Sequence, residues 1–575
     1  MSETAVAGRT SSFAKGLFLG EIHEDLSHPF PYPSPDEARK IKRINRDLRE
    51  FGAGYDEYAA EDARWISDET IARLGEIGAL GLYVPTEYEG QGLSQTGYAR
   101  VFETIARIDP TLSVVLGVHQ SIGYKGIALF GTDDQKAQRL PDLATGRKLA
   151  GFALTEPSAG SDAWNLKSRA VLQPDGSWVL NGEKRYIGNG SRADVLTTFA
   201  RCEVDGRDRH IALLVEKGMA GLEVGERYDT LGLRANDLRR LYFQDVRIPP
   251  ENVLGEPGEG FRIAMSILNN GRIGLGTGSV GGAKELLDMT IAHVTERQQF
   301  GAPLAELEDV QEKVGWMVSY LFGLESMCYL TTGLVDRGVP DYSLESAMCK
   351  IAGTEFLWYQ ANRALQLAGG EGYMRGNRYE KILRDIRIFP IFEGANDVLR
   401  SYVALTGMKP LGEKLAGLGS IGLADPIRSL GVVADYVGGR LRPGARLEHA
   451  HPRLAARAAA VSEQVGRLRS TAEKLLREHR AAIVQQGLQH RRIADALSDV
   501  YAQIAVISRA TALFGEQGVE LSGQEQLIAE SFCARAERRV HGLLDQVESN
   551  DDATMRSIAR LAYKRGAYGY ELASD

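Results

Sequence analysis

The stretch LRDIRIFPIFEGANDVLR, residues 383–400, places one carboxylate, that of Glu393, between an apolar run and a Gly-Ala pair. The run, residues 388–392, contains two Ile and two Phe. Apolar surroundings disfavour the ionised form of a carboxylate and raise its pKa. A general base that acts on a weak acid needs such a pKa. Glu393 is therefore either a base in an apolar site or a side chain that points into solvent.

Two other segments carry residue types that suit contact with a phosphate or a flat ring. FALTEPSAGSD (152–162) offers backbone N–H groups and hydroxyls at its Gly and Ser residues. NGEKRYIGNG (181–190) places an aromatic side chain, Tyr186, before a Gly-rich turn. Taken alone, the first is also compatible with an ordinary Ser/Gly loop and the second with a plain hairpin.

A second pair of segments suits a pyrophosphate. ERQQFG (296–301) contains Arg297, whose guanidinium is a rigid fork of donors. QLAGGEGYMRG (366–376) contains the pair Gly369–Gly370, which lets backbone approach a ligand closely. The alternatives are a surface arginine and the C-cap of a helix.

The segment GTGSVG (276–281) matches the G-x-G-x-x-G pattern, but its context differs from that of a dinucleotide site. The fingerprint requires a preceding strand within a βαβ unit. Here the glycines follow AMSILNNGRIGL, which has a helical pattern. They are expected to form a small face for close helix packing.

The elements that position these segments change along the chain. Residues 35–150 have mostly helical periodicity, for example DETIARLGEIGALGL. Short aliphatic or β-branched runs separated by turn signals such as PDG and VDG follow to about residue 255 and predict strands. Long helical patterns resume at Gly260 and indicate a bundle. The Gly- and Pro-rich stretch 406–452 resembles a linker, and 453–492 and 494–515 are helical again.

Composition excludes several classes of protein. A chain of 575 residues is too long for one simple core, and a net charge of −8 argues against a nucleic-acid binder. The four cysteines are scattered, so neither a metal site nor a disulfide framework is expected. The N-terminus lacks the apolar core of a secretory signal, and no apolar run is long enough to span a membrane. The expected location is cytoplasmic.

Together these segments resemble the acyl-CoA dehydrogenase family, specifically its very-long-chain type. The resemblance rests on SFAKGLF, FPYPSP, HQSIGYKGIALFG, TEPSAGSD, IPPENVLGEPGEGF, LNNGR and LRDIRIFPIFEGAND, in that order. It implies an α-helical N-domain (1–150), a middle β-barrel-like domain (151–260) and a four-helix bundle that binds FAD and carries the catalytic Glu (261–408). A linker (409–452) and an extra C-terminal helical domain (453–575) follow.

The resemblance also assigns roles to residues. Glu393 corresponds to the base that removes the α-proton of an acyl-CoA, while the β-hydrogen leaves as hydride to flavin N5. The expected substrate-binding residues are Ser161, Asn269, Asn270, Gly271, Arg272, Phe392, Gly394, Gly123 and Gly126. The expected FAD-binding residues are Phe152, Ala153, Leu154, Thr155, Ser161, Tyr186, Ile187, Gly188, Arg297, Gln299, Phe300, Gln366, Gly369, Gly370, Ala395, Asn396 and Asp397. No metal is expected.

The resemblance also bears on the acyl pocket, the position of the base and the thioester oxygen. Gly123 and Gly126 resemble glycines that open the floor of the acyl pocket, although helix-packing glycines are the alternative. Some relatives place their base just before the arginine that Arg272 matches, but here that position is Gly271, which cannot act as a base. The thioester oxygen is expected to accept hydrogen bonds from the Glu393 backbone N–H and from an FAD hydroxyl, which is an oxyanion-hole arrangement.

Two positions depart from the family pattern. Gly188 and Ala395 stand where most relatives have Thr or Ser, whose hydroxyls contact the flavin. Each lost hydrogen bond weakens FAD binding by about 0.5–1.5 kcal/mol unless another group replaces it. These departures keep two alternatives open, an assembly or interaction protein with weak catalysis and an acyl-CoA oxidase or biosynthetic acyl desaturase.

The resemblance implies partners as well. A homodimer is expected, with the FAD phosphates reaching across the subunit interface, and an electron-transfer flavoprotein is the expected acceptor. Residues 453–492 carry nine Lys or Arg against three Glu. A basic amphipathic helix of this kind suits peripheral contact with the inner face of a membrane, and a solvated helix face is the alternative.

Overall fold

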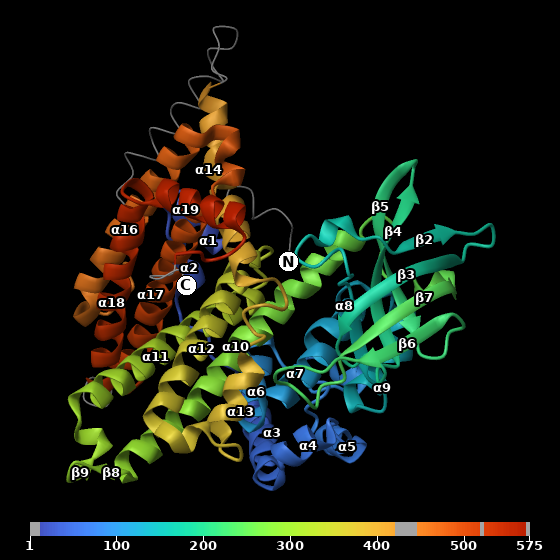
Figure 1. The fold of residues 1–575 in the computed structure, drawn as a ribbon, viewed down its shortest axis with the longest axis horizontal. Coiled ribbons are helices and arrows are strands. Elements are labelled where there is room, and N and C mark those ends of the chain that lie inside the picture. The colour runs from blue at the N-terminus through green and yellow to red at the C-terminus, as the bar shows by residue number, and fades with distance from the viewer. Residues whose placement is uncertain (1–11, 420–445, 518–522, 571–575) are drawn as a thin grey trace.

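The structure is a computed structural model that describes residues 12–419, 446–517 and 523–570. Long helices form a central body, with a β-domain on one side and a C-terminal helical domain on the other (Figure 1). The expected order of helical, β and helical parts is confirmed. Within the described ranges, no helix combines the length and apolarity needed to cross a bilayer.

The N-terminal helices begin at side-chain caps. Ser34, Ser67 and Ser94 each accept a hydrogen bond from the backbone N–H three residues further on. The elements of this part are α1 (Phe13–Phe18), α2 (Glu24–Ser27), α3 (Pro35–Gly54), α4 (Glu57–Ala63), α5 (Asp68–Ile77), α6 (Gln95–Ile108), α7 (Pro110–Gly117), the π-helical turn η2 (Val118–Gly123), α8 (Lys125–Phe130) and α9 (Asp133–Thr145).

The first two helices lie apart from the other N-terminal helices. α1 contacts α12, α14 and α16 of the C-terminal half. The buried carboxylate of Glu345 fixes it there, because it accepts hydrogen bonds from Ser12 Oγ (2.9 Å) and Ala14 N (2.8 Å). The predicted N-terminal domain therefore includes a segment that packs with the C-terminal helices.

The β-domain is a curled seven-stranded sheet in the order β1-β4-β2-β3-β7-β6, with β5 paired to β4. β1 runs parallel to β4, and β4 and β5 form an antiparallel hairpin. Asp205 and Gly206 turn this hairpin with positive φ angles, as the VDG signal predicts. The strands are β1 (Ala150–Ala153), β2 (Arg169–Leu172), β3 (Trp178–Ile187), β4 (Val195–Val204), β5 (Arg207–Glu216), β6 (Leu222–Arg227) and β7 (Arg239–Ile248).

The long helices of the body are α10 (Gly260–Glu296), α11 (Glu308–Asp336), α12 (Ser343–Tyr373) and α14 (Asn396–Gly419). The shorter α13 (Arg378–Ile386) and the strands β8 (Gln298–Gln299) and β9 (Ala302–Pro303) connect them. The GTGSVG segment lies inside α10, where a Cβ at Gly276 would approach the Cys349 Cβ to 3.1 Å. Its predicted role in close helix packing is confirmed.

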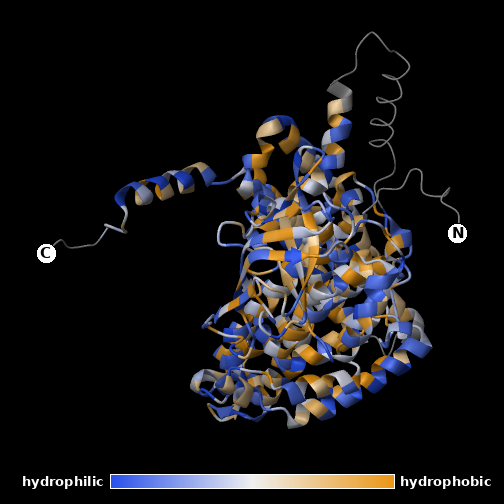
Figure 2. Ribbon diagram, turned by 90° about the vertical axis from the view of Figure 1, so that its right-hand side faces the viewer, coloured by the Kyte–Doolittle hydropathy of each residue, from blue (hydrophilic) through white to orange (hydrophobic). Residues whose placement is uncertain are grey.

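The C-terminal domain consists of α16 (Ala455–His479), α17 (Gly487–Gln517), α18 (Gly523–Glu548) and α19 (Asp552–Arg565). The predicted linker begins at residue 409, but α14 continues to Gly419; residues 420–445 of that linker lie outside the described part. Figure 2 shows α19 extending away from the body toward the chain end marked C.

Much of the positive charge predicted to face a membrane is neutralised within this domain. Three basic residues of α16 pair with α18, namely Arg457 with Glu537, Arg467 with Asp545, and Lys474 with Glu548. The opposite face of α16 is apolar and buried in the domain core. A structural role thus accounts for much of the basic and amphipathic pattern of 453–492.

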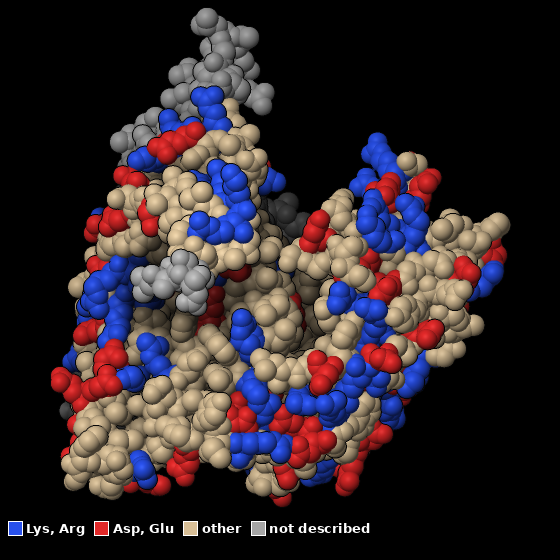
Figure 3. Space-filling view, viewed as in Figure 1, with Lys and Arg blue, Asp and Glu red and all other residues tan. Residues whose placement is uncertain are grey.

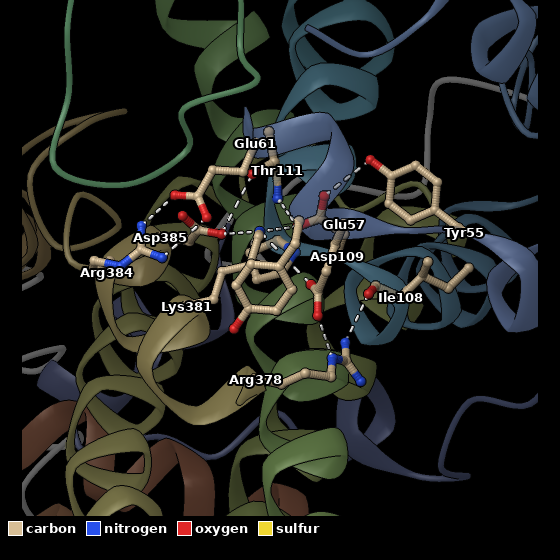
Figure 4. A network of polar contacts seen from close by, with 12 residues as sticks. Tyr55, Glu57, Glu61, Ile108, Asp109, Thr111, Arg378, Lys381, Arg384 and Asp385 are labelled. Atoms are coloured by element: carbon tan, nitrogen blue, oxygen red, sulfur yellow. Dashed lines mark hydrogen bonds and ion pairs between the residues drawn. The ribbon is translucent and has the colours of Figure 1, made fainter. Parts of the chain in front are cut away.

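A buried ionic network joins α13 to the N-terminal helices (Figure 4). Lys381 Nζ lies 2.7 Å from Asp385 Oδ2 and 3.0 Å from Asp109 Oδ1, and all three side chains are at most 2% exposed. Asp385 also accepts a hydrogen bond from Leu233 N (2.6 Å), which anchors the loop between β6 and β7. The network therefore fixes the helix that leads into the Glu393 turn.

Replacing Lys381 with Met leaves two buried carboxylates without their cation. We expect the free energy of unfolding to fall by about 3–5 kcal/mol. The loss should shrink as pH falls, because protonation removes the uncompensated negative charges. Denaturant unfolding at several pH values measures this, with Lys148→Met as the control, since Lys148 and Asp142 form an exposed pair. Equal, small effects of both variants would contradict the assignment.

Candidate active site

A cavity of about 730 Å³ lies where the β-domain meets the long helices. Its walls come from residues 152–164, the end of β3, the loop 230–238, α10 and the segment from α13 into α14. The space-filling view shows the molecule hollowed between the β-domain and the helical body (Figure 3). The cavity thus brings together three segments singled out in the sequence, 152–162, 181–190 and 383–400.

Glu393 lies in the turn between α13 and α14. Its φ is 53° and that of Gly394 is 98°, so two consecutive residues have left-handed backbone. For Glu this conformation is unfavourable and requires support from its surroundings. The support includes Asn396 N donating to Pro390 O (3.0 Å) and Arg272 Nε donating to Glu393 O (3.3 Å).

The carboxylate of Glu393 lies in an apolar, desolvated position. Its Oε2 is buried and has no hydrogen-bond partner among the described residues. Burial raises the pKa of Glu393 to about 7, against the opposing positive charges of Lys350 and Arg272. The carboxyl therefore exchanges its proton near neutral pH, as a general base requires.

Gly271 makes room for this carboxylate. A Cβ at that position would lie 2.8 Å from Glu393 Oε2 and 2.7 Å from Ile122 Cγ2. Any side chain at 271 would therefore displace the Glu393 carboxylate or Ile122. Gly271, Asn269 and Arg272 line the cavity with Glu393, Phe392 and Gly394, while Asn270 points away and donates to Ser266 O (3.0 Å).

The β-domain supplies the other wall. Of the predicted FAD-binding residues, Phe152, Leu154, Thr155, Ser161, Tyr186, Ile187 and Gly188 line the cavity. Ala153 does not, because successive residues of a strand face opposite sides and Ala153 packs in the sheet core. Tyr186 is 51% exposed and has a φ of 58°, which places an aromatic ring at the cavity wall.

Asn236, which no sequence motif singled out, lines the cavity beside Gly188. Its Oδ1 is buried without a partner within the described chain and lies 3.8 Å from the position of a Cβ at residue 188. Such a Cβ would also be only 3.1 Å from Val118 Cγ2. A polar group is therefore present near the missing hydroxyl, contributed by a different residue.

The predicted pocket-floor glycines lie elsewhere. Gly123 and Gly126 are absent from the cavity lining, and a Cβ at Gly123 would be 2.6 Å from Val118 O. They are packing glycines, the alternative considered above. Gly117, Gly274 and Gly278 line the cavity instead, and the ring of Phe102 lies against Gly117 and Gly278.

The remaining predicted FAD residues lie outside the cavity. Arg297, Gln299, Phe300, Gln366, Gly369, Gly370 and Asp397 are exposed in the single chain. Phe300 is 93% exposed. Ala395 is half-buried and Asn396 is buried, both at the start of α14. One chain therefore does not bring the segments predicted to bind the pyrophosphate to Glu393.

The β-domain wall nevertheless fits a flat ring with polar edges. It combines an exposed aromatic at Tyr186, an open position at Gly188 and an unpartnered acceptor at Asn236. A flavin ring has an apolar face and hydrogen-bonding edges, so the residues present fit the predicted FAD. Among the described residues, no group of three or more His, Cys, Asp or Glu could hold a metal ion.

Protein-family models match most of the chain. The model "Acyl-CoA dehydrogenase, N-terminal domain" matches residues 41–147, the middle-domain model matches 151–246, and the C-terminal-domain model matches 258–407. A fourth model, "ACAD9/ACADV, C-terminal domain", matches residues 452–568.

Individual relatives agree with this placement. The mitochondrial very long-chain specific acyl-CoA dehydrogenase of Mus musculus is 36% identical, over 98% of this chain and 89% of the relative. An acyl-CoA dehydrogenase complexed with FAD from Bacillus anthracis is 30% identical, with a TM-score of 0.81 over 97% of this chain and 96% of that chain. Butyryl-CoA dehydrogenase from Megasphaera elsdenii is 29% identical, with a TM-score of 0.63, over 65% of this chain and 99% of its own.

Replacing Gly271 with Ala tests the packing against Glu393. The added Cβ must displace the carboxylate or Ile122, so we expect a loss of about 1–3 kcal/mol in the free energy of unfolding. A crystal structure of the variant should show the Glu393 carboxylate moved. Gly466→Ala is the control, because nothing lies within 4 Å of a Cβ there and the residue is helical. Full stability with an unmoved carboxylate in Gly271→Ala would contradict this account.

Proposed function

Since the chain belongs to the acyl-CoA dehydrogenase family, we propose that it removes the α- and β-hydrogens of a long-chain acyl-CoA to give the trans-2-enoyl-CoA. It is an FAD-dependent oxidoreductase with a role in fatty-acid oxidation. The observation that carries the proposal is the Glu393 carboxylate, buried in the cavity wall with Oε2 unpaired and its pKa raised to about 7.

Glu393 performs the proton transfer. Its carboxylate takes the α-proton of the thioester, and the electron pair of that C–H bond becomes the new carbon–carbon double bond as the β-hydrogen departs with its pair. FAD, when bound, accepts that hydride. Burial keeps the base uncharged until its proton is lost near neutral pH, so the ionised carboxylate is poorly solvated and reactive.

Two neighbouring groups support this transfer. Arg272 Nε holds the carbonyl of Glu393 at 3.3 Å, which fixes the backbone that presents the base. No acceptor for the Glu393 N–H is found within the described ranges. That N–H is available to the thioester oxygen, where it stabilises the negative charge that develops as the proton leaves.

A homodimer is part of the proposal. The pyrophosphate residues Arg297, Gln299 and Gly369 are exposed in one chain, and the ring of Phe300 beside them is 93% exposed. An aromatic this exposed suits burial by a second copy, which would also bring these groups to the FAD of its partner. An electron-transfer flavoprotein would be the acceptor of the electrons removed from the acyl-CoA.

The proposal extends to cellular location. We retain a cytoplasmic location with peripheral membrane contact through 453–492 as a prediction, although ion pairs neutralise several of the charges on which the contact depends. Several curated relatives carry the word mitochondrial in their names.

The Glu393→Gln variant tests the base. We expect FAD to stay bound, while bleaching of its visible absorption by palmitoyl-CoA without oxygen slows by roughly 10²–10⁴-fold. In the wild type, kcat/KM should rise with pH through about 7, because only the ionised carboxylate accepts a proton. Bleaching at the wild-type rate in the variant would exclude Glu393. Turnover of the wild type with oxygen alone would favour an oxidase.

Chain length is set where the cavity ends. Along α10, Gly271 lies at Glu393 and Gly278 lies at Phe102. Seven helical residues separate the two levels by about 10 Å. Gly117 and Phe102 line the cavity at this second level, and we infer that the acyl tail lies against them.

Gly117→Leu should shorten the accepted acyl chain. The new side chain enters the cavity, so we expect kcat/KM for palmitoyl-CoA to fall by roughly tenfold or more while that for butyryl-CoA is retained. Leu129→Gly is the control, because Leu129 is 46% exposed and is not among the residues that line the cavity, so the ratio of the two kcat/KM values should not change. Equal losses for both substrates in Gly117→Leu would contradict the assignment.

A further inference from the structure

Lys350 of α12 is a fully buried lysine with no carboxylate in salt-bridge range among the described residues. Its side chain is 0% exposed. Its Nζ donates to Gly394 O at 2.8 Å and to Asn396 Oδ1 at 2.7 Å. A buried ammonium without an ion-pair partner is costly, so its position calls for a function.

The two bonds of Lys350 enclose the turn that carries Glu393. Gly394 directly follows the base, and Asn396 is the first residue of α14. Arg272 holds the preceding carbonyl, Glu393 O, so two consecutive carbonyls each accept a hydrogen bond from a buried cation. This double attachment stabilises the left-handed backbone at Glu393 and Gly394.

The attachment continues into the C-terminal domain. Asn396 Nδ2 donates to Glu355 Oε1 (3.2 Å), and Glu355 Oε2 accepts from Arg400 (2.7 Å). Arg400 Nε in turn donates to Asp495 Oδ1 of α17 at 2.7 Å. A continuous polar chain therefore runs from the turn of the base to the extra domain.

We propose that Lys350 is a positioning residue for the catalytic base, fixing the Glu393–Asn396 turn and holding a positive charge beside the Glu393 carboxylate. This inference rests on the proposed function, because it assigns Lys350 a role through that base. Its positive charge favours the ionised form of Glu393, which accepts the α-proton.

The charges around the pair come from several elements. Glu393 faces Lys350 and Arg272, and Tyr98 of α6 lies near its carboxylate. Lys350 faces Glu393, Arg272, Glu355 and Arg400. Burial lowers the pKa of Lys350 to about 7, while the negative charge of Glu393 opposes that effect. The two groups therefore titrate in the same pH range, and each favours the charged form of the other. Asp495 of α17, which lies beside Arg400, also belongs to this cluster of charged groups.

Direct titration of Glu393 in the protein without substrate tests the proposal. Infrared difference spectra of protein with isotope-labelled glutamate, referenced to Glu393→Gln, give the protonation midpoint of this one carboxyl. Because no substrate is needed, the result is independent of whether the chain oxidises acyl-CoA. In Lys350→Met we expect the midpoint to rise by roughly one pH unit or more, since a nearby positive charge is lost.

Two further variants separate charge from folding. Lys350→Arg keeps the charge and should hold the midpoint close to that of the wild type. Lys184→Met removes an equally buried lysine that pairs with Glu156 and does not contact the turn, so it should lower stability without moving the midpoint. If Lys350→Met fails to fold, Lys350→Gln carries the same test, because its side chain is polar but uncharged. An unchanged midpoint in the folded neutral variant would overturn the proposal.

Discussion

The active site depends on keeping one carboxylate out of water while fixing its backbone. Glu393 is desolvated, and its Oε2 has no partner in the described part of the chain. Desolvation alone would drive the side chain toward solvent, but the turn that carries it is attached at consecutive carbonyls by Arg272 and Lys350. Because the fixed turn prevents the Glu393 side chain from moving into solvent, burial raises the pKa of its carboxyl.

The rest of the fold provides the space and rigidity for this arrangement. Gly271 leaves room for the carboxylate, and Gly274 and Gly278 extend the same face of α10 along the cavity. The network of Lys381, Asp109 and Asp385 fixes α13 directly before the turn and anchors the loop that carries Asn236. Helix α14 begins directly after the turn, and Arg400 joins it to the C-terminal domain.

The order of domains and the burial of Glu393 in the cavity wall could be predicted because both depend on local features of the sequence. The apolar run before Glu393 indicates that its side chain has apolar surroundings. The change from helical to alternating periodicity marks the β-domain. Pro410 suggested a linker, yet α14 continues because Met408 and Leu411 are buried in the core. Local signals favoured a break that tertiary packing overrides.

Contacts between residues distant in sequence could not be predicted. Lys350 lies in an ordinary helical pattern, and Asn236 in an ordinary loop; only the folded chain brings them to the turn and to the β-domain wall. Gly123 and Gly126 resembled pocket glycines, but Gly123, in the π-helical turn, and Gly126, in α8, are both tightly packed, while Gly117 lines the cavity.

The base can be tested apart from hydride transfer by using an acyl-CoA whose β-carbon bears no hydrogen. Such a compound cannot be oxidised, so deuterium gained at its α-carbon in heavy water, measured by mass spectrometry, reports proton abstraction alone. The account predicts enzyme-dependent exchange that increases through about pH 7 and is lost in Glu393→Gln. Exchange at an undiminished rate in that variant, or a midpoint at the ordinary pKa of a glutamate, would contradict it.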